Sequence, residues 1–286
     1  MNVIAFIKQH GLRKILRYID KNYGFGKLEY LLATNWLNPF ATIWVNFRSF
    51  PLKQALLLPF WVYGRPRFYG LSGSMKIKGH IRPGMIRFNH IQAGRPSLLS
   101  AQSELYNLGD IIFEGEAEIG CGTKIFLEMN SVMRMGKDIL ITDFINIGCF
   151  KSITIGERSQ ITQRCQVTDS NYHYIANFNN GTIPDCMAPI VIGKFCWIGN
   201  SSSIMGGSIL PDYTIVASNS LVNKKCKDIP KNSIIGGTPA KLIATGFRRI
   251  RNSDVDTLVR KYYKTHKQPF VLDPSMTMEE CSRIVK

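Results

Sequence analysis

The sequence has few acidic residues, and it lacks the patterns that mark several other classes of protein. Its 286 residues include 20 Asp and Glu against 36 Lys and Arg, which gives a net charge of +16. The seven cysteines contain no C-x-x-C pair, so we see no zinc site and no disulfide framework, and we expect a reducing, cytoplasmic setting. No recognised nucleic-acid-binding motif accompanies the charge, so DNA and RNA are weak candidates as partners.

Long apolar runs are missing as well. The longest uncharged run, residues 30–47, is interrupted by three Asn and one Pro, whereas a membrane-spanning helix needs about 20 predominantly apolar residues. Before Asp110 there are 15 basic and 3 acidic residues, and residues 3–21 have the pattern of a basic amphipathic helix. We predict a helical, aromatic-rich extension over residues 1–66. Residues 1–65 would either pack on their own domain or contact an anionic membrane surface.

Residues 192–226 carry a repeat of six residues. Each block opens with an aliphatic residue and has a small residue in fifth place. The openers are Ile192, Ile198, Ile204, Leu210, Val216 and Val222, and the small residues are Cys196, Ser202, Ser208, Thr214, Ser220 and Cys226. An α-helix buries a face every 3.6 residues and an ordinary strand every two, so a period of six fits neither.

A period of six predicts a chain that turns a corner every six residues. Three corners make a triangular coil of about 18 residues, whose short parallel strands stack about 4.8 Å from the previous coil. The openers then form an interior ladder, and the fifth residue must be small because it points into a close-packed corner. We therefore predict an all-β core built as a parallel β-helix.

The same period is visible in residues 111–167, where it slips and then resumes. In residues 67–90, short alternations broken by glycines predict strands, either the first coils or a small separate sheet. We place the β-helix domain at residues 67–245. Residues 168–189 interrupt the repeat and are rich in Asn and Pro, so we expect them to form the active-site loop.

Gly and Pro residues in 234–243 are expected to end the β-helix, and residues 246–286 to form a helical tail. Two helix starts are predicted in the tail, with N-caps at Ser253 and Thr277, each followed three residues later by an acidic residue. Short helices of this kind cap the open end of a solenoid or pack against a neighbouring subunit.

His173 is the histidine that lies on the excursion, residues 168–189. An imidazole can take a proton from a hydroxyl at physiological pH, as acyl transfer to a sugar or amino acid requires. A loop histidine that is merely exposed, or bonded to backbone, is the alternative. Asp169 is the nearest carboxylate in sequence to hold the other ring nitrogen, and a backbone N–H near Ser202 or Ser203 could stabilise the oxyanion.

Other chemistries have weaker support. Asp169, Asp185 and His173 could bind a metal in principle, but three ligands on one loop are a weak signal, and we expect no metal. A covalent acyl-enzyme through Cys165 or Cys186 is disfavoured, because neither has a histidine partner at a recognisable spacing.

The stretch 189–199, the coils after it and the segment Ile-Ile-Gly-Gly-Thr-Pro-Ala-Lys-Leu-Ile at 234–243 resemble the hexapeptide-repeat O-acetyltransferases. These include maltose and galactoside acetyltransferases and those of capsule and O-antigen clusters. The resemblance covers residues 167–243. It implies a left-handed β-helix, a homotrimer with active sites between neighbouring prisms, acetyl-CoA as co-substrate, and His173 as catalytic base. It places coenzyme A contacts on Trp197, Asn200, Ser218, Asn223, Lys224 and Lys241.

We therefore expect an O-acetyltransferase that moves acetyl directly from acetyl-CoA to a hydroxyl of a polysaccharide or glycan precursor. It would be cytoplasmic, and peripheral at the inner membrane face if the acceptor is lipid-linked. The alternatives are a small-molecule acetyltransferase acting on serine, a free sugar or an antibiotic, a non-catalytic β-helix scaffold, and a metal-dependent enzyme on the same fold. The run Lys224-Lys-Cys-Lys is longer than the family's usual sequence, so which lysine meets phosphate is open.

Overall fold

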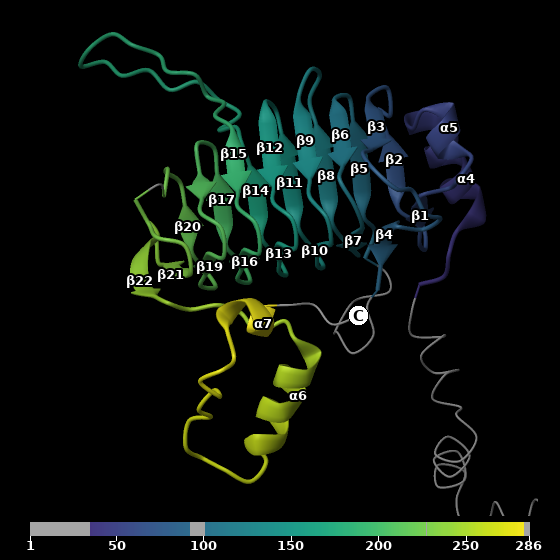
Figure 1. Ribbon diagram of the computed structural model, residues 1–286. Helices are drawn as coiled ribbons and strands as arrows, with labels where there is room; N and C mark the ends of the chain where they lie inside the picture. Colours follow the sequence, from purple (N-terminus) through teal and green to yellow (C-terminus); the bar gives the residue numbers. More distant parts are fainter. Residues whose placement is uncertain (1–34, 92–100, 227, 283–286) are drawn as a thin grey trace, which may run out of the picture.

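The computed structural model describes residues 35–91, 101–226 and 228–282, and within them the chain winds into a three-sided parallel β-helix (Figure 1). Each side is one sheet. The nine-stranded sheet contains β1 (Phe60–Val62), β4 (Ile86–His90), β7 (Ala117–Gly120), β10 (Ile139–Ile141), β13 (Gln160–Ile161), β16 (Trp197–Ile198), β19 (Ile215–Val216), β21 (Ser233–Gly236) and β22 (Lys241–Thr245).

The other two sides complete each coil. The seven-stranded sheet contains β2 (Arg67–Tyr69), β5 (Glu104–Asn107), β8 (Lys124–Leu127), β11 (Asn146–Cys149), β14 (Gln166–Thr168), β17 (Ser203–Met205) and β20 (Leu221–Val222). The six-stranded sheet contains β3 (Ser74–Ile77), β6 (Asp110–Phe113), β9 (Val132–Met135), β12 (Ser152–Ile155), β15 (Ile190–Ile192) and β18 (Ile209–Leu210). Four helices lie outside the coils: α4 (Pro39–Ser49), α5 (Leu52–Ala55), α6 (Ser253–Tyr262) and α7 (Met278–Ser282).

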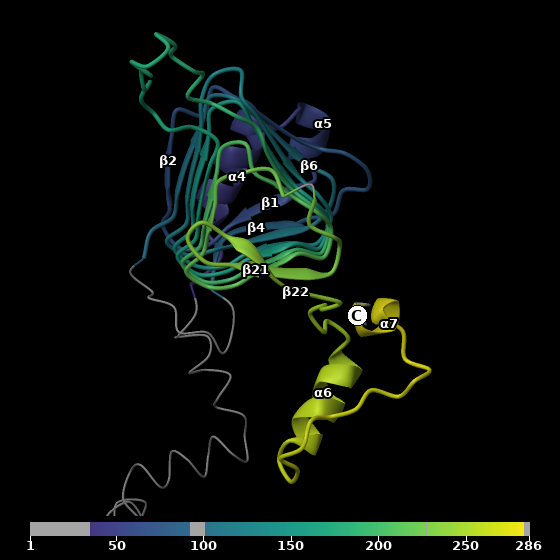
Figure 2. The same ribbon diagram turned by 90° about the vertical axis from the view of Figure 1, so that its left-hand side faces the viewer.

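The coils are left-handed, as predicted. In Figure 2 the C-terminal coils face the viewer, and the chain passes from β4 on the lower side to the sheet of β2 on the left and then to β6 on the right. This path is clockwise while the chain advances toward the viewer, which defines a left-handed helix.

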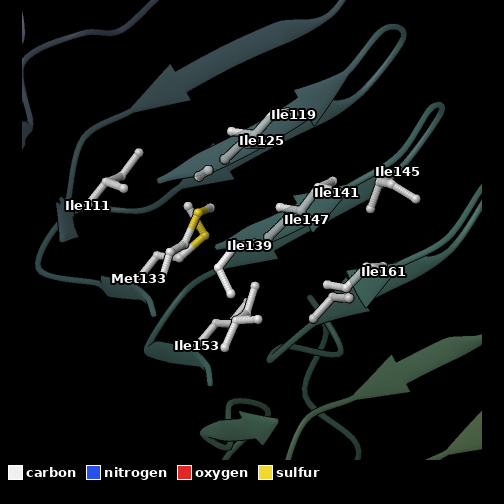
Figure 3. Packing of buried hydrophobic residues seen from close by; sticks show 14 of the residues in the cluster. Ile111, Ile119, Ile125, Met133, Ile139, Ile141, Ile145, Ile147, Ile153 and Ile161 are labelled. Carbon is white, nitrogen blue, oxygen red and sulfur yellow. The ribbon is translucent and has the colours of Figure 1, made fainter. Parts of the chain in front are cut away.

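Stacked aliphatic side chains fill the interior of the prism (Figure 3). Ile119 pairs in register with Ile141, and Ile141 with Ile161, along the nine-stranded sheet. On the seven-stranded sheet Ile125 pairs with Ile147 in the same way. Each of these residues is at most 3% exposed. The irregular period in residues 111–167 therefore belongs to the same ladder as the regular one, as predicted.

The strict repeat in residues 192–226 is confirmed at both of its positions, because all six openers and all six small residues are buried. The small residues also do more than save space. Ser202 Oγ donates to Ala217 O at 3.0 Å, Ser208 Oγ to Val222 O at 2.9 Å, and Thr214 Oγ1 to Pro211 O at 2.8 Å. A small hydroxyl-bearing residue thus fits the corner and bonds backbone carbonyls that would otherwise be buried without a partner.

The N-terminal end of the β-helix is closed by α4. The Asn46 side chain bonds both the N–H and the C=O of Phe60, at 3.2 and 2.7 Å, and Val62 N donates to Thr42 Oγ1 at 3.0 Å. These contacts replace the missing neighbour strand of β1, whose edge would otherwise be free to pair with another chain. At the opposite end β22 pairs antiparallel with β21. The prediction that tail helices could cap an open end is therefore wrong for both ends.

The coils begin before the expected boundary at residue 67, since β1 already pairs with β4. The strands in residues 67–90 are first coils and not a separate sheet. In the tail, Thr277 and Glu280 form the predicted capping box. The other N-cap is Asn252 and not Ser253, because Asn252 Oδ1 accepts from Asp254 N and Val255 N. The helix predicted at 3–21 lies outside the described residues.

Candidate active site

Residues 168–189 form an arm that leaves the β-helix after β14 and returns into β15. Two antiparallel bridges, Ser170 with Met187 and Asn177 with Thr182, make the arm a narrow hairpin, and Figure 1 shows it projecting away from the coils. Every residue from 171 to 185 is exposed. The predicted excursion is thus present, and the coils hold it by its two ends.

His173 lies near the base of this arm, with its side chain exposed. Its backbone N–H donates to Asn171 O at 2.7 Å, and its ring makes no hydrogen bond with any residue that the structure describes. The described part of the chain therefore presents the imidazole to solvent without fixing its orientation. An orienting group would have to come from outside the described residues.

Asp169 does not orient His173. Its buried carboxylate accepts three backbone hydrogen bonds from the turn of the previous coil: from Phe150 N at 2.7 Å, Lys151 N at 2.9 Å and Ser152 N at 2.6 Å. Those donors use its acceptor positions, and they hold the turn between β11 and β12 in place. The suggestion from sequence proximity is therefore corrected: Asp169 anchors the root of the arm.

The residues predicted to contact coenzyme A lie on three parts of the prism. Asn200 and Ser218 occupy consecutive coils of the edge between the nine-stranded and seven-stranded sheets, where Asn219 N donates to Asn200 O at 2.9 Å. Trp197 lies on the outer face of the nine-stranded sheet, and the Arg249 guanidinium is 4.8 Å from the centre of its ring. The structure thus brings Asn200 and Ser218 together and leaves Trp197 on the adjoining face.

Asn223 and Lys224 follow β20, on the same edge as the arm and two coils further along. Coils repeat about every 4.8 Å, so Asn223 and Lys224 lie roughly 10 Å from the root of the arm along the axis of the β-helix. Both are exposed, as is Lys241 at the start of β22. One chain therefore combines His173, Asn223 and Lys224 on a single edge, while the other predicted contacts face elsewhere.

One of the two predicted oxyanion donors is excluded. Ser203 N donates to Ser220 O at 2.8 Å as part of the stacked coils, so this N–H is not available to a substrate. The N–H of Ser202 stays a prediction.

Of the two cysteines considered for an acyl-enzyme, Cys165 is a poor nucleophile in this setting. It is buried, its Sγ donates to Gly199 O at 3.0 Å, and burial raises the pKa of its thiol. Cys186 is half-buried on the arm. Within the described residues neither thiol has a hydrogen bond to a histidine.

Thiol reactivity provides a test of this burial. Burial raises the pKa of the Cys149 and Cys196 thiols to about 12. At Cys149 the nearby Asp169 carboxylate adds a smaller contribution in the same direction. At pH 8 roughly one such thiol in ten thousand is ionised, so neither should react with Ellman's reagent in the folded protein, whereas unfolding in urea should expose all seven cysteines. Peptide mapping of the labelled protein identifies the sites. Rapid labelling of Cys196 at pH 8 without urea would show that the coils open there.

Sequence reasoning missed the arginines of the tail. Arg248 stacks on the ring of Tyr213 at 3.7 Å and donates to Asn232 Oδ1 at 2.5 Å, and Arg249 and Arg251 follow it across the nine-stranded sheet. The signal was present as three arginines in residues 248–251. These arginines fix the start of the tail against the coils.

Neither a metal-ligand cluster nor a membrane-spanning helix is found among the described residues. No three or more His, Cys, Asp or Glu side chains in residues 35–91, 101–226 and 228–282 converge as metal ligands would. In the same ranges no helix combines the length and apolar character needed to cross a membrane.

The chain folds as a left-handed β-helix of hexapeptide coils with a histidine-bearing arm, and its named sequence relatives are acetyltransferases. No family model matches the sequence. A putative lipopolysaccharide biosynthesis O-acetyl transferase, WbbJ of Escherichia coli K12, is 28% identical over 183 residues, which cover 61% of this chain and 89% of WbbJ. The putative colanic acid biosynthesis acetyltransferase WcaF of Escherichia coli K12 is 32% identical over 113 residues, 39% of this chain and 57% of WcaF.

Among solved structures, the polysialic acid O-acetyltransferase OatWY aligns over 70% of this chain and all of its own, with 16% identity and a TM-score of 0.47. The names of the sequence relatives agree with the resemblance to hexapeptide-repeat O-acetyltransferases seen in the motif at 189–199 and the coils after it.

Proposed function

We propose that the protein transfers an acetyl group from acetyl-CoA to a hydroxyl of a polysaccharide or glycan precursor, with His173 as general base. The observation that carries this proposal is an exposed imidazole on an arm rooted in the coils, on the same edge as Lys224. The names of WbbJ and WcaF, which refer to lipopolysaccharide and colanic acid biosynthesis, support a glycan acceptor.

The proposed reaction needs no covalent enzyme intermediate. The His173 imidazole accepts the proton of the acceptor hydroxyl while the oxygen attacks the thioester carbonyl. The tetrahedral intermediate then collapses, the C–S bond breaks, and the imidazolium returns its proton to the departing thiolate. The products are an O-acetyl ester and coenzyme A with a free thiol. Lys224 or Lys241 would pair with the phosphates of coenzyme A.

We further propose that the working unit is a homotrimer. The arm carries large apolar side chains that stay exposed within the described residues: Tyr174 is 67% exposed, Phe178 96% and Ile183 62%. The predicted coenzyme A contacts lie on more than one part of the same prism. A threefold arrangement would bring the arm of one copy to another part of its neighbour and so assemble one site from two chains.

Acetyl-CoA and a panel of acceptors test this function. The panel contains acidic and neutral polysaccharides, lipid-linked oligosaccharides, serine, free sugars and an antibiotic, and released thiol is followed with time. We expect release to depend on a glycan acceptor. Release that requires serine or an antibiotic instead would favour a small-molecule acetyltransferase.

A membrane-facing surface supports a lipid-linked acceptor. Phe40, Ile43, Trp44 and Phe47 lie on one side of α4, and each is between 49% and 85% exposed, although Trp44 also packs edge-on against Phe68. Spacings of three and four residues place them on one face of the helix. Aromatic residues of this kind favour the membrane interface, and the excess of basic residues before Asp110 favours anionic lipid.

Replacing Phe40 and Phe47 together by glutamate tests this surface. We expect binding to vesicles that contain phosphatidylglycerol to weaken by about tenfold or more, because two apolar side chains are lost and two negative charges are added. Vesicle sedimentation measures the effect. Val271→Glu, which changes an 83% exposed apolar residue in the tail, is the control and should bind as the unaltered protein does. Equal sedimentation of both variants would contradict the proposal.

A further inference from the structure

The outer face of the nine-stranded sheet carries a row of side chains in register. Successive strands pair Arg87 with Glu118, Glu118 with Leu140, Leu140 with Gln160, and Gln160 with Trp197. Neighbouring strands lie about 4.8 Å apart, so the row is roughly 19 Å long. It runs from two charged groups through Leu140 to an amide and an aromatic ring, and it forms the floor of a groove.

The C-terminal tail forms the wall of this groove. Two cavities, of about 370 and 550 Å³, lie between tail and sheet, and both are lined by Leu140 and Arg251. The first extends to Arg87, and the second extends to Trp197 and Arg249. In Figure 1 the tail runs beside the strands of this sheet, at the lower side of the view. The two cavities therefore follow the row and meet at Arg251.

The charges in the groove leave Arg251 in need of an anion. Each carboxylate that lines the cavities has a basic partner; the pairs are Glu116–Arg82, Glu118–His90, Asp138–Arg158 and Asp256–Arg260. Arg251 Nη2 is buried and hydrogen-bonds to no described residue. Burial, together with repulsion from Arg249 and Arg158, lowers the pKa of Arg251 to about 10, with Asp138 acting in the opposite direction. An oxyanion bound here would supply the missing partner.

We propose that this groove binds a segment of an acidic glycan chain, with carboxylates paired to Arg251 and Arg87. The inference rests on the proposed function, and it names the class of acceptor. A guanidinium binds a carboxylate through two parallel hydrogen bonds. The length of the row favours a chain over a single phosphate or monosaccharide.

Calorimetric titration of the full-length protein tests the groove. The probe is a tetramer of galacturonic acid, and its methyl ester, which carries no charge, is the control ligand. We expect the acid to bind at least tenfold more tightly than the ester. Arg251→Gln should weaken binding of the acid about tenfold or more, and Arg87→Gln provides the same test if the first variant does not fold. The control is Arg134→Gln, on the six-stranded sheet, which should bind as the unaltered protein does.

Several results would overturn the proposal. One is equal binding of the acid tetramer and its methyl ester. Another is an unchanged affinity of both the Arg251→Gln and the Arg87→Gln variants for the acid tetramer. A third is an Arg251→Gln variant that loses acetyl-CoA binding but still binds the tetramer. A change of oligomeric state in Arg251→Gln would assign the groove to a second copy instead. The titration contains no acetyl donor, so its outcome is independent of whether the protein transfers acetyl groups.

Discussion

Replacing His173 by alanine is expected to lower kcat for acetyl transfer by about 10²–10⁴-fold, the usual contribution of a general base. The acceptor hydroxyl would then have to attack the thioester without losing its proton to the protein. The KM for acetyl-CoA should change little, because His173 is not among the predicted coenzyme A contacts. The rate of thiol release at saturating acceptor, measured for the variant and for the unaltered protein, gives the ratio of their kcat values.

The position of His173 makes this result easy to interpret. Its ring is exposed and makes no hydrogen bond within the described residues, so the substitution removes nothing that holds the coils together. The variant should keep its melting temperature and its oligomeric state. Loss of turnover can therefore be assigned to the missing imidazole and not to unfolding.

His80→Ala is the matched control, because His80 is an exposed histidine on the turn between β3 and β4. Its turnover should equal that of the unaltered protein. Partial recovery of the His173→Ala variant by added imidazole would support the base role. A His173→Ala protein that retains more than about a third of its kcat would remove His173 from the mechanism.

The architecture could be predicted because a β-helix repeats one local rule. An aliphatic residue every six positions, with a small residue in fifth place, is enough to define the stack, and the burial of Ile198 and Ser202 reflects that rule directly. The slips in residues 111–167 did not hide it, because longer turns shift the sequence position of an inward residue without removing it from the ladder. A chain that contacts mainly its own next coil keeps this information local.

Contacts between distant segments could not be predicted in this way. Asn46 lies 14 residues before Phe60, and no repeat relates them, yet its amide closes the edge of β1. Arg249 reaches Trp197 from a tail that has no sixfold period. These contacts depend on how non-repeating segments fold back onto the prism, and a sequence period carries no information about that path.

Asp169 illustrates the limit most directly. It lies four positions before His173, which suggested a catalytic pair, but stacking places its carboxylate against the turn of the coil that precedes it. The three N–H donors come from residues 150–152, 17 to 19 positions earlier, or about one coil. In a solenoid the nearest neighbour in space is one coil away, and proximity in sequence is the weaker guide.

Asp169→Ala should therefore destabilise the fold by about 3–5 kcal/mol, even though the residue lies at the base of the active-site arm. The change removes three charge-assisted hydrogen bonds of 2.6–2.9 Å and leaves the N–H groups of Phe150, Lys151 and Ser152 without their acceptor. A fully buried donor that loses its partner costs about 1–3 kcal/mol, and because these three donors are partly buried, the total is less than three times that cost. Urea unfolding at a fixed protein concentration measures the change.

Asp185→Ala separates this role from a general effect of removing an aspartate near the arm. Asp185 is exposed and pairs with Lys151 Nζ at 3.0 Å, so its loss should leave the unfolding midpoint almost unchanged. Activity gives the decisive comparison, because a turn-anchoring carboxylate and a carboxylate that orients His173 predict different results. An Asp169→Ala protein with normal stability and a kcat as low as that of His173→Ala would return Asp169 to the catalytic pair, since a structural anchor cannot be removed without weakening the coils it joins.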